Sequence, residues 1–134
     1  MKDETGLWVS YADENLAMCR LALEHRHLNA CLQNAQQGVE KYLKAVMVER
    51  ELEFRRTHSV RELVAILAAH RISADISEEE MDLMDTIYVP SKYPDYSALP
   101  ATEPNEGICD EALRIARKVG ERVRSILGGG GSRA

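Results

Sequence analysis

Aromatic residues are rare in this 134-residue sequence, at 5% of the total, and β-branched runs are missing. No segment alternates apolar and polar residues over the length that a half-buried strand needs, so a β-sheet is excluded. Leucine, alanine, glutamate and arginine dominate instead, and these residues favour helices. A chain of this length suits one domain that folds without a metal or a disulfide. The expected fold class is therefore all-α.

Long apolar runs and paired cysteines are also missing. No stretch approaches the ~20 apolar residues of a membrane span, and no apolar run follows the charged start, so no signal peptide is expected. Cys19, Cys31 and Cys109 are far apart in sequence, and we expect reduced, mostly buried thiols in a cytoplasmic protein. The cysteines and histidines lack the paired spacing of metal ligands, and there is no glycine-rich phosphate loop. No metal or cofactor is therefore expected.

Acidic residues outnumber basic ones, and the formal net charge is −5. Charge alone is not expected to bind this chain to nucleic acid, because lysine and arginine supply most of the affinity for phosphate. The charges are uneven: residues 75–111 hold eleven acidic side chains and one basic, whereas residues 114–133 hold six basic and one acidic. The last helix could carry a local basic surface, although solvated faces and matching to the helix dipole explain the same pattern.

Apolar residues that recur every three or four positions predict five helices. Their expected ranges are about 11–26, 30–53, 57 or 59 to 70, 77–88 and 106–127. A serine with an acid three residues later marks three helix starts, at Ser10, Ser59 and Ser77, and Asn29 is the expected cap of the second helix. We predict an antiparallel up-and-down bundle of four to five helices over residues 1–127, with a flexible glycine-rich tail at 128–134.

The second predicted helix carries amides and amines opposite its apolar stripe. At about 100° per residue, the side chains of Gln33, Gln37, Lys41 and Lys44 fall on the side away from Val39 and Val46. Glu40 precedes Lys44 by four residues, which favours an ion pair. Gln36 lies nearer the apolar side and needs hydrogen-bond partners, in the interior or at a subunit interface. On spacing alone, a solvated helix face explains the remaining polar residues equally well.

Two later elements could also carry chemistry. His58 stands at the start of the third predicted helix. An imidazole at this place can accept or donate a hydrogen bond or act as a general base. It could equally be a residue that only caps the helix or packs against its neighbours. Lys92, Tyr93, Pro94 and Asp95 form a compact element inside a proline-rich loop at 89–104. Pro94 disfavours helical geometry at Tyr93, and Asp95 can cap a helix or pair with a cation. By itself this element could be an ordinary turn.

Taken together, these three elements resemble the HEPN domain, a small α-helical module proposed to bind nucleotides. The run QQGVEKYLKA at residues 36–45 resembles the family's Gln-Gln-Ala-x-Glu-Lys-x-x-Lys-Ala. His58-Ser59-Val60 followed by Leu63 resembles its histidine-led helix start, and Lys92-Tyr93-Pro94-Asp95 resembles its Arg-Tyr-Pro-Asp loop. The resemblance covers residues 7–127, and the order and spacing of the motifs make it specific.

The sequence also departs from the family pattern. Gly38 replaces the usual alanine, which costs up to ~1 kcal/mol of helix propensity and permits a close approach of a helix or ligand. Lys92 replaces arginine and loses its bidentate fork. Ribonuclease members carry an arginine followed by a histidine four to six residues later, near the end of the chain, but no histidine follows His70 here. Arg20 precedes His25 by five residues, yet it lies in or near the first helix, the wrong place for this motif.

The resemblance implies a non-catalytic binding module rather than a ribonuclease of the usual kind. It also implies a homodimer and a neighbouring minimal nucleotidyltransferase, as in systems that resemble toxin–antitoxin pairs. In this interpretation a polar groove for a nucleotide or an RNA end is lined by Gln37, Lys41, Lys44, His58, Lys92, Tyr93 and Asp95, with lysines on phosphate and Tyr93 stacked on a base. Two alternatives remain: an atypical ribonuclease that uses His58 as its acid–base residue, and a scaffold that only joins subunits or partners.

Overall fold

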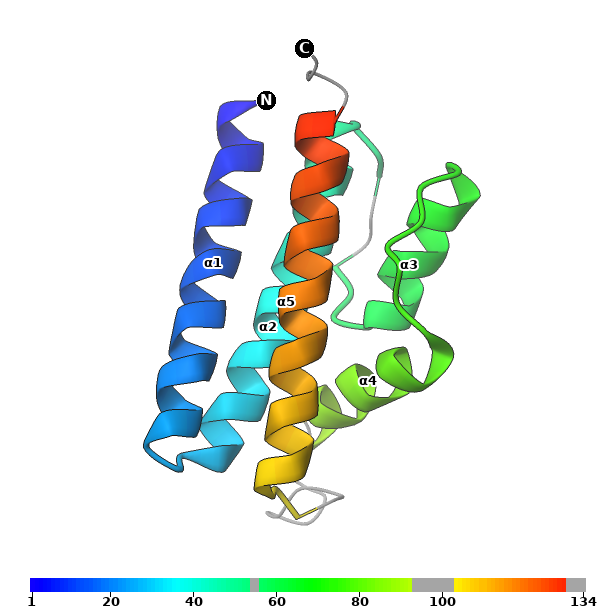
Figure 1. Cartoon of the computed structure of the whole chain (residues 1–134). Coiled ribbons are helices and arrows are strands. Elements are labelled where there is room, and N and C mark those ends of the chain that lie inside the picture. Colours follow the sequence, from blue (N-terminus) through cyan, green and yellow to red (C-terminus); the bar gives the residue numbers. More distant parts are fainter. Residues whose placement is uncertain (54–55, 93–102, 130–134) are drawn as a thin grey trace.

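The computed structural model describes residues 1–53, 56–92 and 103–129, and this part of the chain is helical with no strand (Figure 1). The five helices are α1 (Asp3–Glu24), α2 (Leu28–Glu49), α3 (Val60–Ala69), α4 (Glu78–Lys92) and α5 (Glu106–Gly129). The prediction of an all-α bundle is confirmed. None of the helices in the described ranges is long and apolar enough to cross a membrane.

Helix α2 is the centre of the fold and contacts every other helix. The long helices α1, α2 and α5 run side by side, and the two shorter helices α3 and α4 pack beside them (Figure 1). The first two helices form a hairpin, and the return of α5 along both of them completes a three-helix layer. Side chains of α2 that point away from α1 are therefore covered by α3 and α4, and this second face holds the candidate site.

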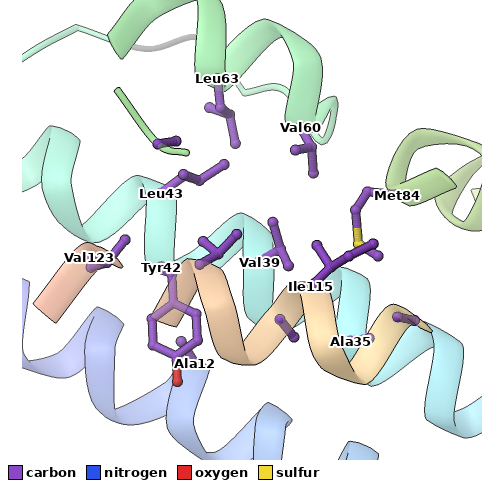
Figure 2. Close-up of a cluster of buried hydrophobic side chains, with 14 of the residues drawn as sticks. Ala12, Ala35, Val39, Tyr42, Leu43, Val60, Leu63, Met84, Ile115 and Val123 are labelled. Carbon is purple, nitrogen blue, oxygen red and sulfur yellow. The ribbon is translucent and has the colours of Figure 1, made fainter. Parts of the chain in front are cut away.

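The core follows from the apolar stripe of α2. Residues that recur every three or four positions along α2 are buried: Leu32, Ala35, Val39, Tyr42 and Val46. Figure 2 shows Leu43 of α2 near Leu63 of α3, with Val60 of α3, Met84 of α4 and Ile115 of α5 around the same cluster. Helices α3 and α4 are amphipathic and short, so they depend on this packing for stability.

Two predicted helix starts are wrong. Helix α1 begins at Asp3 rather than near Tyr11, so Ser10 lies inside the helix and caps nothing. Its first turn is held by Glu49 of α2, which accepts hydrogen bonds from the Lys2 amide (3.0 Å) and the Thr5 hydroxyl (2.9 Å). This contact between helices is invisible in a local pattern. Helix α2 begins at Leu28 after a tight turn, and Asn29 is not its cap.

The other two serine starts are confirmed. Ser59 precedes α3, and its hydroxyl accepts the amide of Glu62 at 3.1 Å. Ser77 and Glu80 form a reciprocal capping box before α4: the Ser77 hydroxyl accepts the Glu80 amide (3.1 Å), and the Glu80 carboxylate accepts the Ser77 amide (2.9 Å). Three helix ends differ from expectation. Helix α2 stops earlier, at Glu49, whereas α4 continues to Lys92 and α5 continues to Gly129.

Candidate functional site

Gln36 is fully buried, and its amide is the first element of the site. The amide nitrogen donates to the Glu40 carboxylate at 3.1 Å and to the backbone carbonyl of His58 at 3.3 Å. Its carbonyl oxygen accepts from the Gln37 amide at 3.0 Å. Gln36 therefore ties α2 to the segment that leads into α3, and the expected interior polar contact of this residue is confirmed.

Glu40 is the centre of the site. Its side chain is 5% exposed and accepts hydrogen bonds from three groups. One carboxylate oxygen, Oε1, is 2.7 Å from Lys44 Nζ and 2.8 Å from His58 Nδ1, and the other, Oε2, accepts from Gln36. A buried carboxylate is costly unless it is paired and hydrogen-bonded, and here both conditions are met. The expected Glu40–Lys44 ion pair is present.

Lys44 does not lie on the solvent face that its spacing predicts. Its side chain is only 9% exposed, and the ammonium lies 5.9 Å from the ring centroid of Trp8 on α1. Lys44 can be buried because Glu40 supplies a buried counter-charge and Trp8 supplies an aromatic face, so the ammonium is stabilised without bulk water. Lys44 thus anchors the site from within and does not project into solvent.

His58 carries the site to the surface. Its side chain is 40% exposed, and its ring stacks on Tyr88 of α4 with centroids 4.6 Å apart and planes 16° from parallel. Because an ionised carboxylate only accepts hydrogen bonds, the short contact to Glu40 places a proton on Nδ1. The imidazole is held by a hydrogen bond at one edge and by a ring on one face, so its orientation is set by α2 and α4 together.

Asp85 of α4 fixes the backbone next to His58. Its carboxylate accepts from the Ser59 hydroxyl (3.0 Å) and from the backbone amides of Val60 (2.7 Å) and Arg61 (3.3 Å). These amides belong to the first turn of α3, where backbone N–H groups have no carbonyl partner within the helix. The positive end of the helix dipole also favours a negative charge at this place. Asp85 therefore locks the start of α3 onto α4, and His58 stands one residue before this cap.

The structure brings only some of the predicted site residues together. Gln37 and Lys44 join His58 through Gln36 and Glu40. Lys41 turns to α1 instead and donates to Asn15 at 2.8 Å. Lys92 belongs to the last turn of α4, with its side chain outside the described part. Tyr93 and Asp95 also lie outside the described residues.

Five residues of the site are not among the predicted site residues: Trp8, Gln36, Glu40, Asp85 and Tyr88. Gln36 was expected only to need interior or interface hydrogen-bond partners. Glu40 was named only as the ion-pair partner of Lys44. The sequence does hold a signal for Glu40, because it lies one helical turn from both Gln36 and Lys44. Three polar side chains on successive turns beside an apolar stripe have to form hydrogen bonds with one another. Trp8, Tyr88 and Asp85 come from other helices, and no local spacing reveals them.

The cysteines take no part in this site. Cys19, Cys31 and Cys109 are buried and unpaired, with the sulfurs of Cys19 and Cys31 3.5 Å apart. Burial and the neighbouring Cys31 raise the pKa of Cys109 to about 12, which keeps this thiol protonated and unreactive. Within the described ranges, no group of three or more His, Cys, Asp or Glu side chains is placed to hold a metal ion.

Comparisons with known proteins agree with this architecture. Residues 5–126 match the family model described as HEPN domain. An archaeal HEPN homologue, ST0689, has a crystal structure that superposes with a TM-score of 0.72 at 23% identity, covering 95% of this chain and 99% of that one. The crystal structure of TT1696 from Thermus thermophilus superposes with a TM-score of 0.73 at 26% identity, covering 92% and 98%. No curated protein matches the sequence.

Proposed function

Since the chain belongs to the HEPN domain family, we propose that it is a non-catalytic module that binds a nucleotide or an RNA end at the surface around His58. It would act as a cytoplasmic homodimer paired with a minimal nucleotidyltransferase, in a system of the toxin–antitoxin type. The family match supports the module, and the chemistry of the site supports the ligand. The dimer and the partner rest on the family resemblance.

The observation that carries the proposal is a buried polar network that ends on an exposed ring. Glu40 and Lys44 form an ion pair inside the bundle, and Gln36 is fully buried beside them. Such groups are weak evidence for stability, because apolar residues of the same size would serve the core as well. Their evident effect is to orient His58, half-exposed and stacked on Tyr88. Oriented polar and aromatic groups at a surface are the usual components of a nucleotide site.

A thermal-shift titration tests ligand binding. The purified protein is melted alone and with mononucleotides and short single-stranded RNA, since a ligand that binds only the folded chain raises its stability by RT ln(1 + [L]/Kd), about 2.7 kcal/mol at 100 times Kd. We expect a rise in melting temperature that grows with ligand concentration in the wild type and is smaller in His58→Ala. His70→Ala, a change at an exposed histidine after α3, is the matched control. If the melting temperature does not rise with any nucleotide or RNA, the proposal is contradicted and a scaffold is favoured.

A second candidate function, RNA cleavage, is favoured by one specific contact. The Glu40 carboxylate on Nδ1 and the exposed position of the ring form an acid–base pair of the kind that activates a hydroxyl. The late arginine and histidine of ribonuclease members are missing, so His58 would have to replace them. Incubation of the protein with mixed RNA separates the two functions: cleavage by the wild type that His58→Ala abolishes supports the ribonuclease, and intact RNA supports binding alone.

The proposed dimer has a surface available on α1. Four of its large apolar side chains are about half exposed, namely Leu7, Tyr11, Met18 and Leu21. Exposed apolar residues that gather on one helix are typical of interaction surfaces. Light scattering after size exclusion tests the dimer, and a mass of one chain at micromolar concentration contradicts it. Sequencing of the flanking genes tests the partner, because the proposal requires a minimal nucleotidyltransferase beside this gene.

A further inference from the structure

Cys19 of α1 and Cys31 of α2 lie against each other inside the bundle, with their sulfur atoms 3.5 Å apart. We propose that this pair is a redox site: a hydroperoxide oxidises the two thiols to a disulfide, which cross-links α1 to α2 and stabilises the fold. The proposal goes beyond the function proposed above, and it does not depend on ligand binding at His58. In a reducing compartment the pair stays reduced, and the disulfide forms only when oxidant is present.

The two sulfurs are already close to the separation of a disulfide. An S–S bond is about 2.05 Å long, so the sulfurs have to approach each other by about 1.5 Å. Both residues are fully buried, and they come from the two arms of the α1–α2 hairpin, whose helices pack closely against each other. A movement of this size is within the reach of side-chain rotation. The hairpin therefore holds the thiols together before oxidation and keeps its shape afterwards.

The surroundings of the pair make Cys19 the reactive sulfur. The hydrogen bond from the Cys31 thiol is the largest cause that lowers the pKa of Cys19, and the positive charges of Arg117 and Arg20 act in the same direction. The same hydrogen bond raises the pKa of Cys31, which keeps its proton. The thiolate is the form of cysteine that attacks an oxidant. Cys19 is therefore oxidised first, and Cys31 lies beside it to complete the disulfide.

The oxidation takes two balanced steps. The Cys19 thiolate attacks one oxygen of hydrogen peroxide, the O–O bond breaks, hydroxide leaves, and Cys19 becomes a sulfenic acid. The sulfur of Cys31 then attacks the sulfur of Cys19, so an S–S bond forms and the S–O bond breaks. The leaving hydroxide takes the proton of Cys31 and departs as water. The two sulfurs together lose two electrons, and these reduce the peroxide.

The oxidant reaches the pair at one end of the bundle. Cys31 belongs to the first turn of α2, and Cys109 belongs to the first turn of α5. The Cys109 sulfur lies 3.4 Å from the Leu28 carbonyl, so these two helix starts cover each other. Helix ends open locally at a much lower cost in free energy than the middle of a core. Hydrogen peroxide is small and uncharged, and such an opening admits it, although more slowly than an exposed thiol would react.

Peptide mapping tests which sulfurs join. The reduced full chain is treated with hydrogen peroxide under native conditions, remaining thiols are alkylated, and a tryptic digest is analysed by mass spectrometry without reduction. Arg20 and Lys92 place the three cysteines on separate tryptic peptides. We expect the peptides of Cys19 and Cys31 to be linked in the wild type and in Cys109→Ala, the matched control. A link to Cys109 instead, or thiols that all stay free or stop at sulfinic acid, would overturn the proposal.

Melting temperature tests the stabilising effect. The oxidised wild type should melt roughly 5–10 °C above the reduced protein, because a disulfide that closes a short loop lowers the entropy of the unfolded chain. Dithiothreitol should reverse this rise. Cys31→Ala treated in the same way controls for oxidation elsewhere and should show no rise. An oxidised wild type that melts no higher than the reduced protein also overturns the proposal, whereas ligand binding at His58 is tested separately on reduced protein.

Discussion

The ring of Tyr42 on α2 lies directly against the backbone of Gly120 on α5. A β-carbon at Gly120 would be 2.9 Å from two ring carbons and 3.1 Å from the phenol oxygen. The ring cannot retreat, because it is fully buried and its hydroxyl donates to Asp13 of α1 at 2.6 Å. Three helices thus meet at one contact that only glycine permits, and the spacing of α5 from α2 depends on it.

Gly120→Ala should destabilise the fold by about 1–2 kcal/mol, because overpacking outweighs the gain in helix propensity. Gly38→Ala is the matched control on α2, where a β-carbon would have only ordinary contacts, at 3.4 Å from the Asn15 side chain and 3.5 Å from the Ala12 carbonyl. That variant should be neutral or gain up to about 1 kcal/mol. Urea unfolding of both proteins measures the difference, and equal midpoints would contradict the packing described.

Tyr42→Phe should cost about 1–2 kcal/mol, because Asp13 loses its buried donor. Arg124 of α5 also pairs with Asp13, and its guanidinium lies 6.0 Å from the Tyr42 ring, so part of the network remains. Burial and the bond to Asp13 raise the pKa of Tyr42 to about 12. The contribution of the neutral hydroxyl should therefore hold below pH 10 and disappear as the pH rises through 12. Melting temperatures of the wild type and Tyr42→Phe measured from pH 8 to pH 12 test this loss. A difference between the two proteins that stays constant over the whole range would contradict the prediction.

Glu80 should set part of the acid stability. Burial raises its pKa, but hydrogen bonds from Lys118, the Ser77 amide and Arg114 outweigh burial and lower the pKa to about 2. A carboxyl with a lower pKa in the folded chain stabilises the fold above its unfolded pKa of about 4.5, and this contribution is lost as the pH falls towards 2. We expect this contribution to the free energy of unfolding to be roughly 2 kcal/mol. It is smaller than the pKa shift alone would give, because Arg114 and Lys118 are partly exposed and solvent screens their charges.

Glu80→Gln isolates the charge of this residue, because glutamine can still complete the capping box with Ser77. The variant should lose stability at pH 7 and show a flatter dependence between pH 5 and pH 2. Glu79→Gln changes an exposed neighbour in the same helical turn and should follow the wild type. The urea midpoint of unfolding is measured for each protein across this pH range. If the midpoint changes with pH equally in Glu80→Gln and in the wild type, the ion pairs of Glu80 contribute nothing to stability.

Lys44→Met tests whether the site network is coupled. Removal of one partner from a buried pair leaves the Glu40 carboxylate with the hydrogen bonds from Gln36 and His58 and without its lysine, and we expect a loss of about 2–4 kcal/mol. Adding Glu40→Gln removes the orphaned charge, so the double variant should lose less than the sum of the single changes. Lys41→Met, one turn earlier and bonded to Asn15, should cost under about 1 kcal/mol. Additive losses in denaturant unfolding would contradict a coupled network.

Local patterns in the sequence were sufficient for several features. The apolar spacing predicts five helices in order, and Ser59 and Ser77 cap helices as their spacing indicates. The direction of Gln36 on α2 predicts a buried amide, and the interval from Glu40 to Lys44 predicts their pairing. All of these features depend on residues within one or two helical turns, where backbone geometry fixes which side chains meet.

Contacts between distant segments could not be predicted in the same way. Lys44 is buried because Trp8 comes from α1, and α1 starts early because Glu49 of α2 binds its first turn. The stack of Tyr88 on His58 joins residues thirty positions apart. Each depends on how helices cross, and this is set by packing of the whole core rather than by the pattern of a single helix.

The central claim is that His58 is the ligand-facing end of the buried network, and histidine ring NMR tests it most directly. The other three histidines provide internal controls, since His25, His27 and His70 are exposed at helix ends. On addition of a short uracil RNA, the ring signals of His58 should shift in proportion to bound RNA while the other three stay in place. RNA that binds without moving the His58 signals, or that moves the other histidines instead, would contradict the claim.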